Sequence, residues 1–120
     1  MSRVAYVNGR YLPYARAAVH VEDRGFQFAD GVYEVIGVLG GQLVDADGHV
    51  DRLERSLKEL RIALPMSRGA LTAVMAETVR RNLVRDGLIY IQVTRGAAKR
   101  EFAFPANTRP TVVAIPRSLN

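Results

Sequence analysis

The stretch VYEVIGVLGGQLVDADGHVDRLERSLKEL, residues 32–60, contains the change of pattern that indicates the fold class. The residues before Gly40-Gly41 are typical of a strand, the two glycines predict a turn, and the residues after them predict a second strand that runs back along the first. After the turn the period changes, and the apolar stripe of an amphipathic helix follows at three- and four-residue spacing. The residues of this stripe are Val50, Leu53, Leu57 and Leu60. A hairpin that leads into a helix predicts an α+β domain.

Two helices are expected in the middle of the chain. The first is predicted from Asp47, as the N-cap, to about Leu64, because Pro65 ends the pattern. The second is predicted from the cap residue Ser67 to about Arg85. Its inward-facing residues at four-residue spacing are Leu71, Met75, Val79 and Leu83, and Asp86-Gly87 stops it.

Strands are expected on both sides of these helices. RVAYVNGRYLPY, residues 3–14, reads as two short strands around an Asn8-Gly9 turn. Residues 88–95 form an apolar strand, 96–110 a long loop and 111–116 a final strand, while VHVEDRGFQFADG, residues 19–31, is a loop rich in charge and glycine. The expected architecture is therefore α+β, with a mostly antiparallel sheet and two helices.

Composition limits the classes of function. A chain of 120 residues suits one compact domain. The 17 lysines and arginines exceed the 12 acidic residues, but they are scattered, so they do not indicate a nucleic-acid site. No apolar run approaches the roughly 20 residues of a membrane span. No secretion signal or cysteine is present, so we expect a cytoplasmic protein, and the two distant histidines argue against a metal site.

The strand from Val32 carries the first candidate residues. Alternation places Tyr33 and Val35 on one face and Glu34 on the other. Tyr33 is either a ligand-binding hydroxyl or a core tyrosine with its hydroxyl at the edge. Glu34 lies between apolar neighbours, so it needs a cationic partner or an edge position.

Basic residues supply the other candidates. Arg52 follows His49 by three positions at the border of the predicted helix's apolar stripe, where it could bind a phosphate or carboxylate, or pair with Glu59 or another nearby acid. Arg95, Lys99 and Arg100 lie within six residues at the start of the long loop. Such a cluster is either an anion site or a solvated surface loop.

Three segments in this order resemble a known family. They are EDRGFQFADGVYEV (22–35), HVDRLERSLKELRI (49–62) and IYIQVTRGAAKREFAFPANTRP (89–110). The chain, residues 1–120, resembles the N-terminal domain of fold-type IV pyridoxal-phosphate enzymes, the class IV aminotransferases, and is most similar to bacterial D-amino acid aminotransferases. The resemblance implies the N-terminal domain of that fold, a homodimer, and transamination between D-amino acids and a 2-oxo acid with pyridoxal 5'-phosphate as cofactor.

The resemblance also implies roles for single residues. Arg52 matches the arginine that grips the cofactor phosphate. Tyr33 matches the strand tyrosine that reaches the substrate carboxylate, and Val35 would line the substrate pocket. Arg100 matches the loop arginine that reaches across the dimer to hold the carboxylate.

The chain departs from the family pattern in two respects. Phe102 stands where D-amino acid enzymes usually have histidine, which weakens the carboxylate trap and leaves (R)-amine transaminases, aminodeoxychorismate-type lyases and branched-chain enzymes open. In addition, the family's Schiff-base lysine belongs to a C-terminal domain, and neither Lys58 nor Lys99 matches it. We therefore expect the 120-residue chain alone to be inactive, and the alternative from another class is a non-catalytic dimerisation domain.

Overall fold

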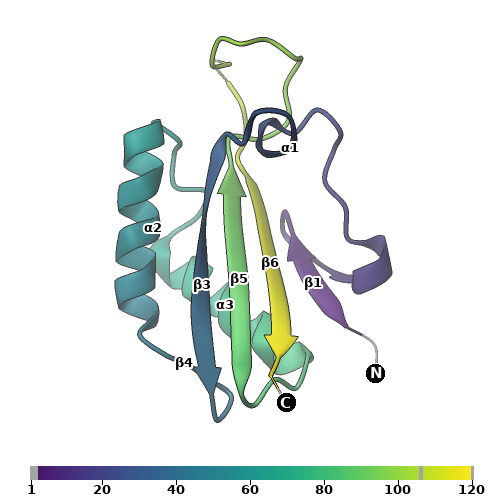
Figure 1. Ribbon diagram of the computed structural model, residues 1–120, viewed down its shortest axis with the longest axis vertical. Helices are drawn as coiled ribbons and strands as arrows, with labels where there is room; N and C mark the ends of the chain where they lie inside the picture. The colour runs from purple at the N-terminus through teal and green to yellow at the C-terminus, as the bar shows by residue number, and fades with distance from the viewer. Residues whose placement is uncertain (1–2, 106, 120) are drawn as a thin grey trace.

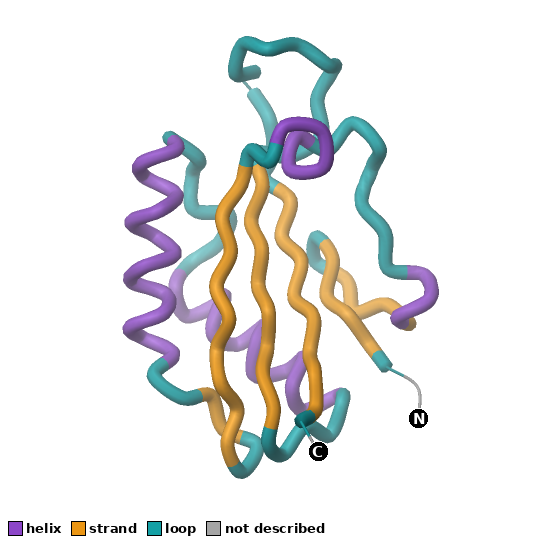
Figure 2. Tube along the Cα trace, in the orientation of Figure 1, coloured by secondary structure: helices purple, strands orange, loops and turns teal. Residues whose placement is uncertain are grey.

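A computed structural model, which describes residues 3–105 and 107–119, contains one six-stranded sheet in the order β2-β1-β6-β5-β3-β4 (Figures 1 and 2). All paired neighbours are antiparallel, so the predicted α+β class is confirmed. The strands are β1 (Val4–Val7), β2 (Arg10–Pro13), β3 (Gly31–Leu39), β4 (Gln42–Leu43), β5 (Gly87–Thr94) and β6 (Thr111–Ser118). The helices are α1 (Arg24–Phe28), α2 (Ala46–Leu60) and α3 (Arg68–Arg81), with a short 3-10 turn at Tyr14–Arg16.

Both predicted turns join antiparallel strands. Asn8 and Gly9 have positive φ angles of 49° and 91°, and they join β1 to β2. Gly40-Gly41 joins β3 to β4 in the same way. Residues that tolerate positive φ therefore decide where these hairpins turn.

The core lies on one face of the sheet. In Figure 1, α3 crosses behind the strands and α2 runs beside β3. The buried apolar residues of both helices form one cluster with those of β3, β5 and β6. Six residues that were predicted to face inward are buried: Val50, Leu53, Leu57, Leu71, Met75 and Val79. The opposite face of the sheet carries no helix layer among the described residues.

The predicted bounds of the first helix were wrong at both ends. The helix begins at Ala46, so Asp47 lies in its first turn instead of capping it. It ends at Leu60 and not Leu64, because Arg61 adopts a left-handed conformation with φ 57°. The next residue, Ile62, is buried and donates its amide to the Leu57 carbonyl, a motif that usually has glycine at the left-handed position.

The second helix begins as predicted but ends early. The Ser67 hydroxyl accepts a hydrogen bond from the Ala70 amide at 3.1 Å, which confirms the cap. The helix stops at Arg81 instead of Arg85. Leu83 was predicted to face inward, but its side chain is 72% exposed and its φ is 54°. Val84 is buried in its place, because the left-handed residue turns the chain.

A short helix in the segment predicted as a loop brings distant segments together. Asp23 caps α1 by accepting a hydrogen bond from the Gly25 amide at 2.8 Å. Gly96 opens the long loop at φ 111°, and a Cβ there would overlap the Arg109 carbonyl, so the two ends of the loop touch.

Within the described residues, no helix is long and apolar enough to cross a bilayer.

Candidate functional site

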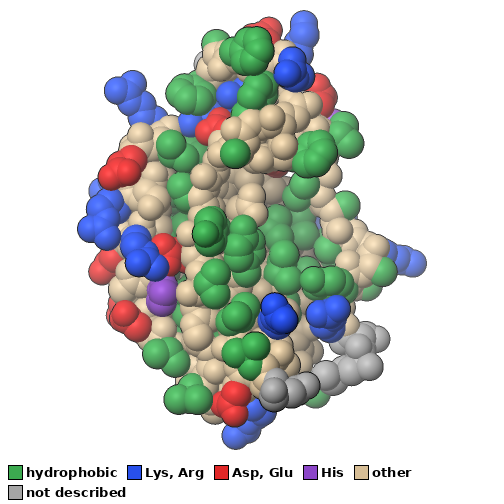
Figure 3. Space-filling model, in the orientation of Figure 1, with side chains coloured by type: hydrophobic (Ala, Val, Ile, Leu, Met, Phe, Trp, Pro, Cys, Tyr) green, Lys and Arg blue, Asp and Glu red, His purple; other side chains and the backbone are tan. Residues whose placement is uncertain are grey.

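Strand β3 presents different residues on its two faces. Tyr33 and Val35 are 62% and 41% exposed on the open face of the sheet, whereas Glu34 is only 6% exposed on the helix face. This alternation agrees with the sequence. Figure 3 shows hydrophobic side chains gathered over the strands of the open face. A ligand can therefore approach Tyr33 from this side.

The ring of Tyr33 is held in place by its neighbour across the sheet. It stacks on Tyr90 with 5.4 Å between the ring centroids and 25° between the planes. The Tyr90 hydroxyl donates to Gln92 Oε1 at 2.8 Å. Together with Gly25, these residues line a shallow hollow of about 320 Å³ beside α1. The alternative of a core tyrosine with its hydroxyl at the edge is wrong, because Tyr33 is 62% exposed.

Glu34 has a cationic partner, as its apolar surroundings required. Arg52 donates from Nε to Glu34 Oε2 at 2.8 Å and from Nη2 to Oε1 at 2.9 Å, while His49 Nδ1 lies 2.8 Å from Oε1. The acid that pairs with Arg52 is thus Glu34 and not Glu59. The hydrogen bond from Arg52 lowers the pKa of Glu34 despite the opposing effect of burial.

The ion pair leaves Arg52 able to bind a further anion. Its side chain is 59% exposed, and Nη1 has no hydrogen-bond partner among the described residues. A guanidinium offers five donors, of which Glu34 occupies two. Glu34 therefore orients the guanidinium without saturating it, and the remaining donors suit a phosphate.

Arg100 lies on the long loop among aromatic rings. Its guanidinium is 5.4 Å from the centroid of Phe28 and 5.6 Å from that of Phe102, and these rings meet edge to face at 5.9 Å. Phe102 itself is 83% exposed. Within residues 3–105 and 107–119, no acid pairs with Arg100, and it has no hydrogen bond or ring contact with Tyr33. Within one chain, Arg100 and Tyr33 therefore make no direct contact, and the expected role of Arg100 across a dimer stays a prediction.

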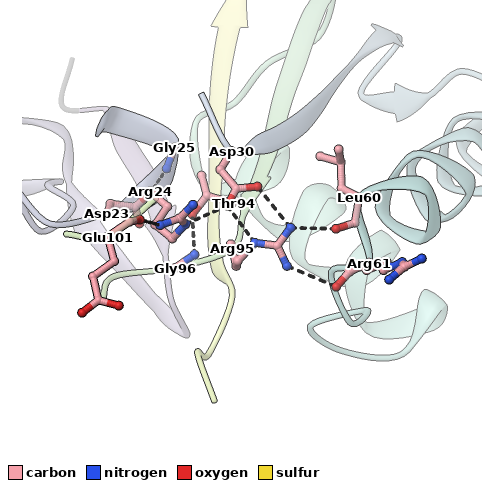
Figure 4. Close-up of polar contacts among 10 residues, drawn as sticks. All are labelled: Asp23, Arg24, Gly25, Asp30, Leu60, Arg61, Thr94, Arg95, Gly96 and Glu101. Carbon is pink, nitrogen blue, oxygen red and sulfur yellow. Dashed lines mark hydrogen bonds and ion pairs between the residues drawn. The ribbon is translucent and has the colours of Figure 1, made fainter. Parts of the chain in front are cut away.

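Arg95, which sequence grouped with the loop cations, has its anion within the chain (Figure 4). It donates to Asp30 from Nε at 2.7 Å and from Nη2 at 3.2 Å. Arg24 donates from Nε to the same carboxylate at 2.8 Å. All three residues are buried, with exposed fractions of 2% for Arg24, 8% for Asp30 and 7% for Arg95. We call these three residues the buried ion cluster.

The buried ion cluster also joins the sheet to α2. Arg95 donates to the carbonyl oxygens of Leu60 at 2.7 Å and Arg61 at 3.2 Å, where the helix ends. Burial raises the pKa of Asp30, but the hydrogen bonds and charges of Arg95 and Arg24 outweigh it and leave the pKa below its ordinary value. Sequence reasoning missed the cluster because Asp30 and Arg95 are 65 positions apart, and no spacing pattern connects them.

Comparison with known proteins identifies a family. The family described as Amino-transferase class IV matches residues 31–120. The D-alanine aminotransferase of Bacillus licheniformis is 45% identical over 107 residues, which cover 89% of this chain and 38% of that protein. The chain spans about 40% of the length of the curated relatives that it matches first.

Solved structures share the fold. The 4-amino-4-deoxychorismate lyase from Pseudomonas aeruginosa superposes with a TM-score of 0.78 at 29% identity, over 95% of this chain and 39% of the lyase. The branched-chain amino acid aminotransferase from Escherichia coli superposes with a TM-score of 0.91 over 99% of this chain and 42% of that enzyme. Its identity is 20%, so it shows the fold alone.

Proposed function

This chain belongs to the class IV aminotransferases, and we propose that it is the N-terminal domain of a cytoplasmic pyridoxal-phosphate transaminase for D-amino acids. The family resemblance of the sequence is thereby confirmed. The 45% identity to a D-alanine aminotransferase, of which the chain spans 38%, supports this substrate class. In this proposal, the remaining length of such an enzyme forms a second domain that supplies the catalytic lysine.

The observation that carries the proposal is the arrangement of β3. One strand turns Glu34 toward Arg52 and Tyr33 toward the open face, so two adjacent residues of one rigid element orient the guanidinium and present the tyrosine ring. Rigid elements hold a site more accurately than loops. Two anionic groups, one on a cofactor and one on a substrate, would therefore be held in a fixed relation.

Arg52 fits the phosphate of pyridoxal phosphate. Its free Nη1 and its exposed position allow charge-assisted hydrogen bonds to phosphate oxygens. Bound pyridoxal phosphate supplies the electron sink that amino-group transfer requires. Arg52 contributes retention and orientation of the phosphate, and Glu34 keeps the guanidinium in place.

Tyr33, Val35 and Arg100 bind the substrate. The Tyr33 hydroxyl donates to the carboxylate of the amino donor or of the 2-oxo acid that accepts the amino group, and Val35 lines the pocket beside it. Arg100 has no acidic partner among the described residues of its own chain, so in a homodimer it can hold the carboxylate in the site of the second copy. The dimer thereby completes the site.

Phe102 narrows the substrate class. Its exposed ring beside Arg100 provides apolar surface but no hydrogen-bond donor for a carboxylate. A donor with an apolar side chain is therefore favoured over a small acidic one. The same feature supports the second candidate function, an (R)-amine transaminase, whose substrate has no carboxylate.

The experiment compares amino donors in the full-length protein after its intact mass has been measured. With 2-oxoglutarate as acceptor, we expect D-alanine to be turned over faster than an (R)-amine. In a separate measurement, we expect the Arg52→Ala variant to lose the absorbance of the bound cofactor on dialysis. A preference for the amine would favour the second candidate. Pyruvate release from a chorismate-derived amine would identify a lyase, and folded dimers without cofactor absorbance would identify a non-catalytic domain.

A further inference from the structure

We propose that the buried ion cluster is a positioning device that sets where the Arg100 guanidinium lies. This inference rests on the proposed function, in which Arg100 holds a substrate carboxylate. None of the three residues is placed to touch substrate, because each is buried. They act on Arg100 through two contacts of Arg24, one with the backbone of the loop and one with an aromatic ring.

The first contact is a hydrogen bond to the loop backbone. Arg24 Nη1 donates to the carbonyl oxygen of Glu101 at 2.7 Å (Figure 4). In the described part of the loop from Lys99 to Pro110, no other residue makes a hydrogen bond. Since Glu101 directly follows Arg100, with Cα atoms about 3.8 Å apart, this bond fixes the backbone that carries the guanidinium.

The second contact is a shared aromatic ring. The guanidinium of Arg24 lies 4.6 Å from the centroid of Phe28, and that of Arg100 lies 5.4 Å from the same centroid. Cations within about 6 Å of a ring centroid are attracted by the ring. Phe28 therefore connects the side chain of Arg24 to the side chain of Arg100, independently of the backbone.

The cluster is itself fixed from three sides. Asp30 holds both guanidinium groups, and Arg95 also binds the carbonyl end of α2. The backbone of Arg24 donates to the Gly96 carbonyl at 2.9 Å, which anchors the start of the loop to α1. Phe104, farther along the loop, lies over Arg95 at 4.1 Å. The loop therefore contacts the buried ion cluster at Gly96, at Glu101 and at Phe104.

The chemistry of Arg24 explains why this position needs a guanidinium. Its planar fork points Nε at Asp30 and Nη1 at Glu101 at the same time. A lysine would keep the buried charge but has a single ammonium without this fork. The substitution Arg24→Lys therefore separates the geometric role from the charge.

The first test measures the loop without reference to activity. In the full-length enzyme, trypsin should cut after Arg100 about tenfold faster in Arg24→Lys than in wild type, since the loop loses its hydrogen bond at Glu101. Trypsin should also cut the Phe28→Leu variant faster than wild type, although this variant leaves the buried ion pairs intact. If Arg24→Lys does not fold, Phe28→Leu takes its place in the test. The matched control is Arg68→Lys, which alters a pair on the exposed surface of α2 and α3. Equal cleavage in all variants would overturn the proposal.

The second test couples Arg24 to Arg100. The KM for the D-amino acid should rise about tenfold in Arg24→Lys with little change in kcat, and the double variant with Arg100→Lys should show no further rise beyond Arg100→Lys alone. If the rise in KM of the double variant were the product of the rises in the two single variants, the positioning role would be overturned. If Arg100→Lys alone left KM unchanged, the proposed function would fail, while faster cleavage in Arg24→Lys would still support positioning of the loop.

Discussion

Arg52 on α2 binds both carboxylate oxygens of Glu34 on β3, and this pair connects the helix to the strand that bears Tyr33. The buried member is the acid, and the exposed member is the arginine. A buried carboxylate is stable only when its charge is matched. The pair therefore fixes the exposed guanidinium beside the strand that presents Tyr33.

Glu34→Gln should weaken cofactor retention. Glutamine has a similar shape but lacks the charge that holds the Arg52 guanidinium, so the Kd for pyridoxal phosphate in the full-length enzyme should rise about tenfold. Cofactor absorbance after dialysis against a series of pyridoxal phosphate concentrations measures this Kd. Glu54→Gln is the control, because Glu54 pairs with Arg68 away from β3. Equal retention in Glu34→Gln and wild type would show that Arg52 needs no orienting partner.

The same pair predicts how stability depends on pH. The hydrogen bond from Arg52 lowers the pKa of Glu34 in the folded state, although burial opposes it. The unfolded chain has the ordinary glutamate pKa of about 4.3. Glu34 therefore contributes stability above about pH 4.3, and this contribution is lost as the pH falls through the lower folded-state pKa.

Denaturant unfolding at several pH values measures this contribution. Wild type should lose more unfolding free energy between about pH 6 and pH 3 than Glu34→Gln, which has no carboxyl group to protonate at this position. Asp30 has a lowered pKa as well, so both proteins should retain some acid sensitivity. An identical pH dependence in the two proteins would contradict the assignment to Glu34.

Leu83→Gly should cost little stability. Leu83 is 72% exposed with φ 54°, a conformation that costs a residue with a Cβ about 1–2 kcal/mol, so glycine relieves strain that partly offsets its greater freedom in the unfolded chain. Leu57→Ala, at a fully buried position, should instead cost about 2–5 kcal/mol. Thermal and denaturant unfolding compare the two. A loss above about 2 kcal/mol in Leu83→Gly would mean that Leu83 packs inward, as a helix to Arg85 requires.

Local signals predicted much of the fold. The Asn8-Gly9 turn, the Ser67 cap and the buried stripe of α2 each depend on residues close in sequence, where spacing and backbone preference decide the outcome. The helix ends were mispredicted because Arg61 and Leu83 occupy left-handed positions where glycine would have been the signal. Their conformation depends on burying Ile62 and Val84 in the core, which is a tertiary effect.

In the candidate site as well, features that depend on neighbouring residues were predicted, and those that depend on distant residues were not. Alternation along β3 predicted the faces of Tyr33, Val35 and Glu34. The identity of the partner of Glu34 was left open, because Arg52 reaches it from another element. The buried ion cluster was beyond prediction for the same reason, since Arg95 at the end of a strand looked like a ligand for an external anion. Pairing between distant segments becomes visible only once the fold is known.

Phe102→His should shift specificity toward donors that have a carboxylate. A histidine beside Arg100 can donate a hydrogen bond to that carboxylate, whereas the phenylalanine ring offers only apolar surface. The ratio of kcat/KM for D-alanine to kcat/KM for an (R)-amine should therefore rise about tenfold, the effect of about one charge-assisted hydrogen bond. The matched control is Phe26→His, because Phe26 is also an exposed phenylalanine but lies on α1; this variant should leave the ratio unchanged. If both variants changed the ratio equally, the effect would come from added surface polarity, and Phe102 would have no part in selecting the donor.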